Sequence, residues 1–309
     1  MATMIANCNQ TMFAALNVPA YGGGFERYAG IRYGDADRQS LDVYTPSHTG
    51  PPHRPVVVFW YGGVWTKGSK EQYRFVGAAL ARSGYVAILP DYRLYPQVRF
   101  PQFVEDGALA VKWAQQHAAE FRGDAQAIFL MGHSAGAHIA ALIALDPRYL
   151  RQAGADPQRV LGWIGISGPY ALNTDIPGMP ILREIFRAPY TAADWQVTAI
   201  PGEHSPRTLL LHGTDDLDPR DVLALEQTLH ARGTHVECHI YQGVTHMMSV
   251  AALSLPLRGT APSLADIVNF IDQSTSATAA PRAPNPGQRC PELRFVKDTT
   301  SDGMRAEVQ

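Results

Sequence analysis

The chain has 309 residues, 46% of them hydrophobic and 17% charged, which excludes disorder throughout and leaves enough apolar side chains for one large core. Its formal net charge of −2 excludes a strongly basic surface, so neither nucleic acid nor an anionic membrane is an expected partner. A neutral organic small molecule fits this charge balance best.

The cysteines and the apolar runs exclude several further classes of protein. Cys8, Cys238 and Cys290 are far apart and form no CxxC pair, so we expect three free thiols, with Cys238 buried in a strand. No apolar run approaches the ~20 residues that cross a bilayer. The N-terminus has no basic region followed by an apolar stretch, so the default compartment is the cytoplasm, or the periplasm or exterior if a presequence has been removed.

Strand-like and helix-like segments alternate along the chain, and this alternation predicts an α/β fold with a mostly parallel sheet and helices on both of its faces. Residues 55–60 form a continuous apolar run, which is typical of a central strand buried on both sides. The predicted elements of the first half are, in chain order, two early strands within 29–45 (the second over 40–44), a strand over 55–60, a helix over 70–83, a strand over 85–89 and an amphipathic helix over 102–118.

The second half continues the alternation and ends in a polar tail. Its predicted elements are, in chain order, a strand over 127–131, a small-residue helix over 135–145, strands over 160–166 and 208–211, a helix over 219–232, a strand over 235–241 and a helix over 262–273. Residues 168–205, rich in Pro, Gly and aromatic residues, are predicted to form a short lid or cap. The expected organisation is an N-terminal extension over 1–28, a main domain over 29–273 and a loosely ordered, low-complexity tail over 274–309.

The sharpest chemical signal is the run Gly132-His133-Ser134-Ala135-Gly136, a G-x-S-x-G pattern between a buried strand and a small-residue helix. That context is the one a nucleophile elbow requires. The tight turn holds the serine in a strained conformation, and glycines two residues before and after it remove side chains that would clash. Ser134 is therefore the predicted nucleophile.

A serine hydroxyl needs a base, because it is a poor nucleophile at neutral pH. Among the histidines after Ser134, His246 follows the last predicted strand in a loop, where an imidazole can reach over the sheet. His235 and His239 lie within that strand in ordinary half-buried patterning, and they lack a third ligand for zinc. His246 is therefore the predicted base, and no metal site is expected.

The acid that orients the base should follow the preceding strand, where three aspartates crowd one loop. We favour Asp216 by its position and keep Asp215 as the rival. Asp218, directly before Pro219, fits the N-cap of the next helix.

An oxyanion hole is predicted after the first central strand, in the run Tyr61-Gly62-Gly63-Val64-Trp65. Adjacent glycines let backbone amides approach a developing negative charge closely. The predicted donors are the amides of Gly63 and Val64 together with that of Ala135.

The segment Pro55–Leu145 resembles α/β-hydrolase esterases, the group of bacterial acyl esterases, kynurenine formamidases and isoprenylcysteine methylesterases. The residues that carry the likeness are YGGVW (61–65), DYRLYP (91–96), FPQFVED (100–106), GHSAGAHIAA (132–141), LLLHGTDD (209–216) and YQGVTH (241–246). The likeness extends over residues 29–273. It implies the α/β-hydrolase fold with a short lid insertion, and it implies the same triad of Ser134, Asp216 and His246.

One position departs from the resemblance. Many relatives have His where Tyr61 stands, and that histidine supports the oxyanion loop. A different contact must therefore anchor the loop here. In having Tyr61 at this position, the sequence resembles the methylesterase branch. The tyrosine therefore weakens the inference that this protein has formamidase activity.

The residues and the resemblance together predict a serine hydrolase that cleaves small or medium carboxylic esters, without a metal or organic cofactor. The alternatives are an arylformamidase acting on N-formylkynurenine, a carbohydrate acetyl or feruloyl esterase, and a non-catalytic binding protein of the same fold. Trp65, Tyr170, Phe186 and Trp195 are candidates for the substrate pocket, with plain packing under the lid as the other interpretation. A monomer or homodimer is expected.

Overall fold

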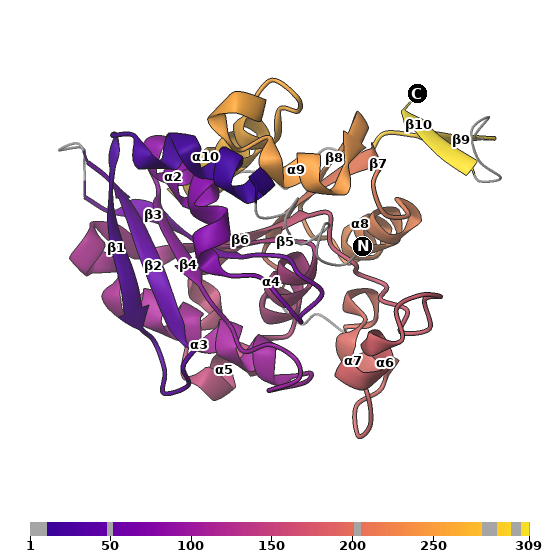
Figure 1. Cartoon of the computed structure of the whole chain (residues 1–309), viewed down its shortest axis with the longest axis horizontal. Helices are drawn as coiled ribbons and strands as arrows, with labels where there is room; N and C mark the ends of the chain where they lie inside the picture. Colours follow the sequence, from indigo (N-terminus) through magenta and orange to yellow (C-terminus); the bar gives the residue numbers. More distant parts are fainter. Residues whose placement is uncertain (1–10, 48–51, 201–204, 280–288, 298–303, 309) are drawn as a thin grey trace.

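The computed structural model of the protein describes residues 11–47, 52–200, 205–279, 289–297 and 304–308 (Figure 1). The strands of its main sheet are β1 (Phe25–Arg32), β2 (Ser40–Pro46), β3 (Arg54–Trp60), β4 (Val86–Pro90), β5 (Gly123–His133), β6 (Val160–Ile166), β7 (Arg207–Asp215) and β8 (Val236–Thr245). The eight strands lie in the order β1-β2-β4-β3-β5-β6-β7-β8. Strand β2 pairs antiparallel with β1 and β4, and the pairs from β4–β3 to β7–β8 are parallel.

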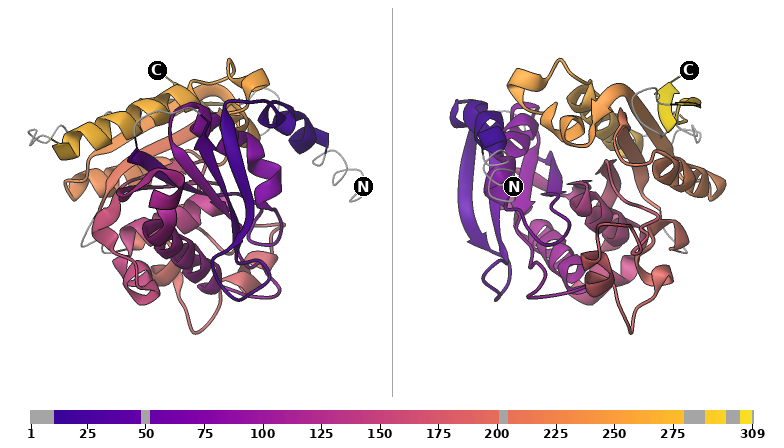
Figure 2. Two further views of the ribbon diagram at one scale, coloured as in Figure 1. Left: turned by 90° about the vertical axis from the view of Figure 1, so that its left-hand side faces the viewer. Right: turned by 45° about the vertical axis from the view of Figure 1, so that its right-hand side comes forward.

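Helices cover both faces of this sheet. The α-helices are α2 (Arg74–Arg82), α3 (Gln102–His117), α4 (Ala135–Leu145), α5 (Pro147–Ala153), α6 (Ile181–Ile185), α7 (Ala192–Trp195), α8 (Arg220–Ala231), α9 (His246–Ala251) and α10 (Ser263–Ala279). The 3-10 helices are η1 (Val18–Tyr21), η2 (Lys70–Tyr73), η3 (Ala118–Phe121), η4 (Pro157–Arg159), η5 (Val197–Ala199) and η6 (Leu255–Leu257). Helices α2 and α10 lie on one side of the sheet, and α3, α4 and α5 lie on the other (Figure 2).

The mostly parallel sheet with helices on both faces confirms the predicted fold class. The burial of the elements also follows the sequence pattern. Strand β3 is buried from Val56 to Trp60, as its continuous apolar run predicts. Helix α4 is buried at all of its residues and packs against β3, β5 and β6, as its small and aliphatic side chains indicate. Several elements extend beyond their predicted bounds: β1 begins at Phe25 instead of 29, β5 covers Gly123–His133 instead of 127–131, and α10 continues to Ala279 instead of 273.

Part of the predicted N-terminal extension is firmly attached to the domain. Residues 11–17 are helical, and Leu16 is buried. The side chain of Asn17 donates to the carbonyl oxygens of Glu71 and Gln72 and accepts from the amide of Phe75. These bonds fasten the segment to the start of α2.

The expectation of a loosely ordered tail is wrong for the described part of residues 274–309. After α10 the chain forms an antiparallel pair of strands, β9 (Leu293–Lys297) and β10 (Met304–Val308). Strand β10 contacts β7 and β8, and Ala306 is buried there. A polar composition therefore did not prevent the tail from pairing with itself and packing beside the sheet.

The expectation of three free thiols is also wrong. Cys238 of β8 and Cys290 of the tail form a disulfide, with their Cα atoms 4.6 Å apart. Their separation of 52 residues hides this proximity, because only the path of the tail past β8 brings them together. Arg289 adds an ion pair of 2.5 Å to the buried carboxylate of Glu226. Cys8 lies outside the described residues.

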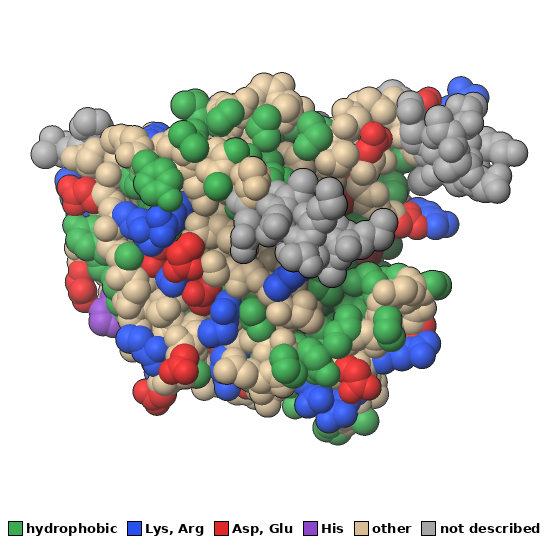
Figure 3. Space-filling view, in the orientation of Figure 1, with side chains coloured by type: hydrophobic (Ala, Val, Ile, Leu, Met, Phe, Trp, Pro, Cys, Tyr) green, Lys and Arg blue, Asp and Glu red, His purple; other side chains and the backbone are tan. Residues whose placement is uncertain are grey.

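The formal net charge of −2 predicts no strong electrostatic field around the protein. On the face shown in Figure 3, positive and negative side chains are intermixed without a large patch of one sign. Among the described residues, no helix is both long and apolar enough to cross a bilayer.

Candidate active site

Ser134 lies in a sharp turn between β5 and α4, with φ 55° and ψ −122°. A positive φ is unusual for a residue with a side chain and strains the backbone. The flanking glycines make room for the turn: a Cβ on Gly132 would overlap the backbone of Gly136, and one on Gly136 would overlap the carbonyl oxygen of Trp60. The local sequence therefore forms the predicted elbow and exposes the hydroxyl at the end of β5.

Ser134, Asp216 and His246 directly follow the ends of β5, β7 and β8, and the structure brings their side chains together. The loop expected before His246 is absent, because residues 241–245 belong to β8 and His246 is the first residue of α9. The Nε2 atom of His246 lies 2.9 Å from Ser134 Oγ, and its Nδ1 lies 2.6 Å from Asp216 Oδ1. A carboxylate only accepts, so Nδ1 carries the ring proton and Nε2 is free to accept from the serine hydroxyl. This is the geometry of a nucleophile, a base and an orienting acid.

The imidazole contacts Asp216 and not Asp215. Asp215 is exposed and accepts from the hydroxyl of Thr214, whereas the side chain of Asp216 is fully buried. Burial alone would raise the pKa of Asp216, but the hydrogen bond from His246 and the nearby His212 imidazole lower it to about 2. Asp216 is therefore a carboxylate at neutral pH and can stabilise a protonated His246.

The predicted oxyanion loop has an unusual backbone beside Ser134. Gly63, Val64 and Trp65 have φ values of 143°, 54° and 55°. The turn is closed by the amides of Thr66 and Lys67, which both donate to the carbonyl oxygen of Gly63, so its hydrogen bonds do not use the amides of Gly63 and Val64. The amide of Ala135 is the first of α4, where a helix leaves its own N–H groups without intrahelical acceptors.

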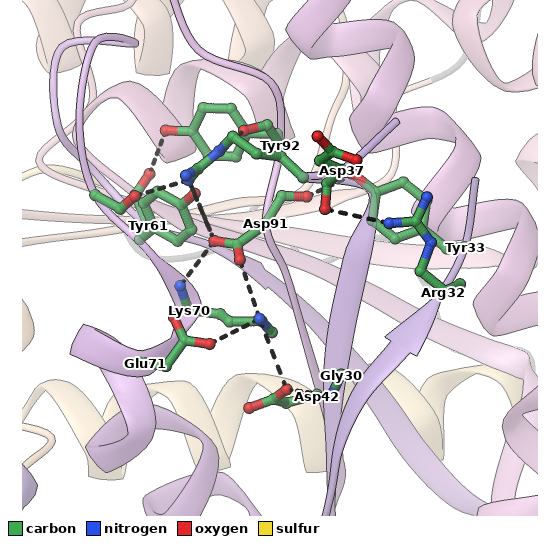
Figure 4. A network of polar contacts seen from close by, with 12 residues as sticks. Gly30, Arg32, Tyr33, Asp37, Asp42, Tyr61, Lys70, Glu71, Asp91 and Tyr92 are labelled. Carbon is green, nitrogen blue, oxygen red and sulfur yellow. Dashed lines mark hydrogen bonds and ion pairs between the residues drawn. The ribbon is translucent and has the colours of Figure 1, made fainter. Parts of the chain in front are cut away.

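Tyr61 anchors the oxyanion loop through a buried polar network (Figure 4). Its hydroxyl donates to Asp91 Oδ1 at 2.8 Å and accepts from Arg38 Nη2 at 2.7 Å. The hydroxyl of Tyr92 donates to the carbonyl oxygen of Tyr61, and Lys70 binds Asp91 through both its amide and its Nζ. Burial raises the pKa of Tyr61 well above its usual range, so the phenol stays a donor. This is the different loop-anchoring contact that the tyrosine implied.

We expect Tyr61→Phe to lower the free energy of unfolding by about 1–3 kcal/mol, because Arg38 and Asp91 each lose a buried partner. The turnover number should fall as well, since the loop carrying Gly63 and Val64 loses its support. Urea denaturation and ester hydrolysis measure the two effects. Tyr61→His keeps a ring donor and should retain more activity; equal stability and turnover in Tyr61→Phe and the parent would refute the anchoring role.

A pocket of about 410 Å³ opens over Ser134 and His246. Its other lining residues are Met12, Phe13, Gly62, Gly63, Val64, Lys67, Gly68, Gln72, Tyr73, His133 and Met247. Lys67 brings a positive charge to this lining. The size and the apolar side chains suit a small or medium ligand with an apolar part.

The aromatic residues predicted to bind substrate lie elsewhere. Trp65, Tyr170 and Trp195 are buried and do not line this pocket. The Trp65 ring packs against Phe103, His138 and Phe186, and Tyr170 packs against Trp163. The carbonyl oxygen of Trp195 binds His138 Nε2 at 2.7 Å. These contacts fit the other interpretation of the three aromatic residues, which is plain packing under the lid segment.

The sequence pattern missed eight residues of the pocket lining, among them Met12, Phe13, Tyr73 and His133. Met12 and Phe13 come from the N-terminal extension, and nothing near them in the chain signals a site. Tyr73 ends η2, and His133 is the variable residue of the elbow motif itself. Within the described residues, no group of three or more His, Cys, Asp or Glu side chains is placed to hold a metal ion.

Comparisons with known proteins agree with this fold. Residues 41–156 match the BD-FAE family model. The chain is 30% identical over 260 residues to a probable isoprenylcysteine α-carbonyl methylesterase of Arabidopsis thaliana, covering 74% of this chain and 52% of that protein. It is 32% identical over 203 residues to the esterase LipC of Mycobacterium tuberculosis, covering 60% of this chain and 50% of LipC.

A solved structure extends the likeness to the whole domain. Inhibited esterase B from Lactobacillus rhamnosis superposes with a TM-score of 0.75 at 19% identity, covering 90% of this chain and 97% of that chain. The chain spans about half the length of the two curated relatives described above. It therefore has the α/β-hydrolase fold, has a segment over residues 41–156 that matches the BD-FAE family model, and is similar in sequence to proteins named as esterases.

Proposed function

We propose that this protein hydrolyses carboxylic esters through an acyl-enzyme on Ser134. The observation that carries the proposal is the unbroken line of contacts from Ser134 Oγ to His246 Nε2 and from His246 Nδ1 to the buried Asp216. A serine with such a base becomes an effective nucleophile at neutral pH. The relatives named as esterases support the same reaction class.

The reaction would proceed in two acyl-transfer steps. His246 Nε2 takes the hydroxyl proton as Ser134 Oγ bonds to the ester carbonyl carbon, and the carbonyl oxygen becomes an oxyanion. The amides of Gly63, Val64 and Ala135 donate to that oxyanion. His246 then gives its proton to the departing alkoxide. A water molecule, deprotonated by His246, attacks the acyl-enzyme, and the acid leaves as Ser134 regains its proton.

The pocket lining indicates the substrate. Met12, Phe13 and Met247 provide an apolar wall beside Ser134, so one part of the ester is apolar and of small or medium size. The related methylesterases carry isoprenylcysteine in their names, and an apolar substituent near the ester is compatible with this wall.

A substrate panel tests the proposal. Purified protein is assayed with p-nitrophenyl esters from acetate to dodecanoate, with an acetylated sugar, a feruloyl ester and N-formylkynurenine. We expect the highest kcat/KM with an apolar ester of short or medium chain. Much faster cleavage of N-formylkynurenine would identify an amidase instead. No turnover of any substrate by correctly folded protein would favour a binding function.

Phe13→Ala should raise the KM for p-nitrophenyl hexanoate by roughly tenfold, because an apolar contact of a few methylene groups is lost. The turnover number should stay close to that of the parent, since the triad is untouched. Tyr21→Ala is the matched control: it removes an exposed aromatic ring of the same N-terminal segment outside this pocket lining. Equal KM values for Phe13→Ala and Tyr21→Ala would remove Phe13 from the binding site.

A further inference from the structure

His133, the residue before the proposed nucleophile, makes two buried hydrogen bonds that the mechanism above does not use. Its Nε2 lies 3.0 Å from the carbonyl oxygen of His246, and its Nδ1 lies 3.4 Å from the hydroxyl of Tyr73. Both His133 and Tyr73 are almost fully buried. The ring of His133 therefore lies between η2 and His246, the proposed base at the start of α9.

The protons on this chain of contacts can be assigned from chemistry. A carbonyl oxygen only accepts, so Nε2 of His133 carries the hydrogen. Burial, reinforced by the neighbouring His246, lowers the pKa of His133 to about 3, so the ring is neutral and Nδ1 is a lone pair. Burial also raises the pKa of Tyr73, which keeps its proton. The hydroxyl of Tyr73 thus donates to Nδ1, and Nε2–H donates to the backbone of His246.

At the His246 end of this series of hydrogen bonds, further contacts hold the start of α9. The carbonyl oxygen of His246 also accepts from Ser249 Oγ at 2.7 Å, and Ser249 Oγ accepts from Ser167 Oγ at 2.8 Å. The rings of His133 and His246 lie with their centroids 4.9 Å apart. The backbone of His246 is thereby fixed from two sides.

At the other end of this series of hydrogen bonds, Tyr73 and His133 contact the oxyanion loop. A Cβ on Gly62 would lie 3.1 Å from His133 Nδ1 and 2.9 Å from Ser134 Cβ, so the loop backbone packs directly on both residues. The Tyr73 ring stacks on that of Tyr61, the residue directly before Gly62. Three parts of the site, the oxyanion loop, the elbow and the start of α9, therefore meet at His133 and Tyr73.

We propose that Tyr73 and His133 are positioning residues that hold the backbone of His246 and the oxyanion loop in register with Ser134. The proposal rests on the ester hydrolysis proposed above. Neither side chain takes or gives a proton in the reaction. Their removal would leave all groups of the triad present but let the imidazole and the loop move relative to Ser134, and misplacement of this kind lowers turnover more than ground-state binding.

Kinetics of point variants test this role. Tyr73→Phe keeps the ring and loses only the hydroxyl, and His133→Gln keeps an N–H near the place of Nε2, whereas His133→Ala keeps neither contact. We expect kcat to fall roughly tenfold to a hundredfold in Tyr73→Phe and further in His133→Ala, with KM within about twofold of the parent. His133→Gln should recover part of the loss.

The affinity for a trifluoromethyl ketone, which mimics the tetrahedral intermediate, should fall in parallel with kcat, while that for the product carboxylate stays the same. Tyr85→Phe is the matched control, because it removes a buried hydroxyl that binds Asp272 of α10, away from the site. It should lower stability without changing kcat. If Tyr73→Phe behaved like Tyr85→Phe, with lower stability and unchanged kcat, the positioning role would be refuted.

A measurement without substrate separates this proposal from the proposed function. In the ¹⁵N NMR spectrum of histidine-labelled protein, His133 should remain the neutral Nε2–H form from pH 5 to pH 9, identified by the loss of its signals in His133→Gln. A ring that titrates in that range, or that carries its proton on Nδ1, would overturn the proposal even in an active esterase. A protein inactive on every ester with His133 in the expected form would instead contradict the proposed function alone.

Discussion

Ser134→Ala should lower kcat for the best p-nitrophenyl ester by about a millionfold, the loss found when the nucleophile of a triad is removed. The variant keeps the backbone of the elbow, the oxyanion loop and the pocket, so it should still bind substrate with little change in affinity. A stopped-flow trace of p-nitrophenol release should show no burst, whereas the parent should release one equivalent per active site when deacylation is slower than acylation.

The control for this variant is Ser83→Ala. Ser83 lies at the end of α2, where its hydroxyl binds the carbonyl oxygen of Ala79. The Ser83→Ala variant loses a serine hydroxyl outside the pocket and should therefore keep the kcat of the parent. Substantial ester hydrolysis by Ser134→Ala, at a rate above contaminating activity, would mean that another group is the nucleophile.

Asp216→Asn should lower kcat by about 10⁴-fold, because an amide at this place favours the wrong ring tautomer of His246 and stabilises no imidazolium. The same change at Asp215 should alter kcat less than twofold, since that exposed carboxylate binds Thr214 and not the imidazole. The pair of variants differs by one position in one loop. A large loss in Asp215→Asn with an active Asp216→Asn would reverse the assignment of the acid.

The lowered pKa of Asp216 predicts that the stability of the protein changes with pH. Its pKa is lowered from 3.8 to about 2 in the folded chain, so the unfolded chain takes up the proton first as pH falls. The stabilising contribution of Asp216 is therefore fully present above its unfolded pKa of about 3.8 and is lost as pH falls toward 2. The difference in unfolding free energy between the parent and Asp216→Asn should shrink over this interval, as measured by urea denaturation at each pH.

Local patterns in the sequence determined most of the fold and the identity of the candidate nucleophile. The alternation of strands and helices, the apolar run before Trp60 and the glycines around Ser134 are signals within a few residues of one another. Backbone sterics and burial act over the same short range, so these features can be predicted without coordinates. The place of His246 after the last strand was predictable for the same reason, because the carboxyl ends of parallel strands meet at one edge of the sheet. The loop expected there was not, since β8 continues to Thr245 and α9 begins at His246.

Only the tertiary structure decided which residues surround that chemistry. It turns Asp216 and not Asp215 toward His246, puts Phe13 of the N-terminal segment in the pocket, and buries Trp65 elsewhere. It also joins Cys238 to Cys290 and pairs β9 with β10. Some of these contacts join segments that are distant in the sequence, and others depend on which of two neighbouring side chains faces inward. Their energies come from packing that exists only once the whole chain has folded.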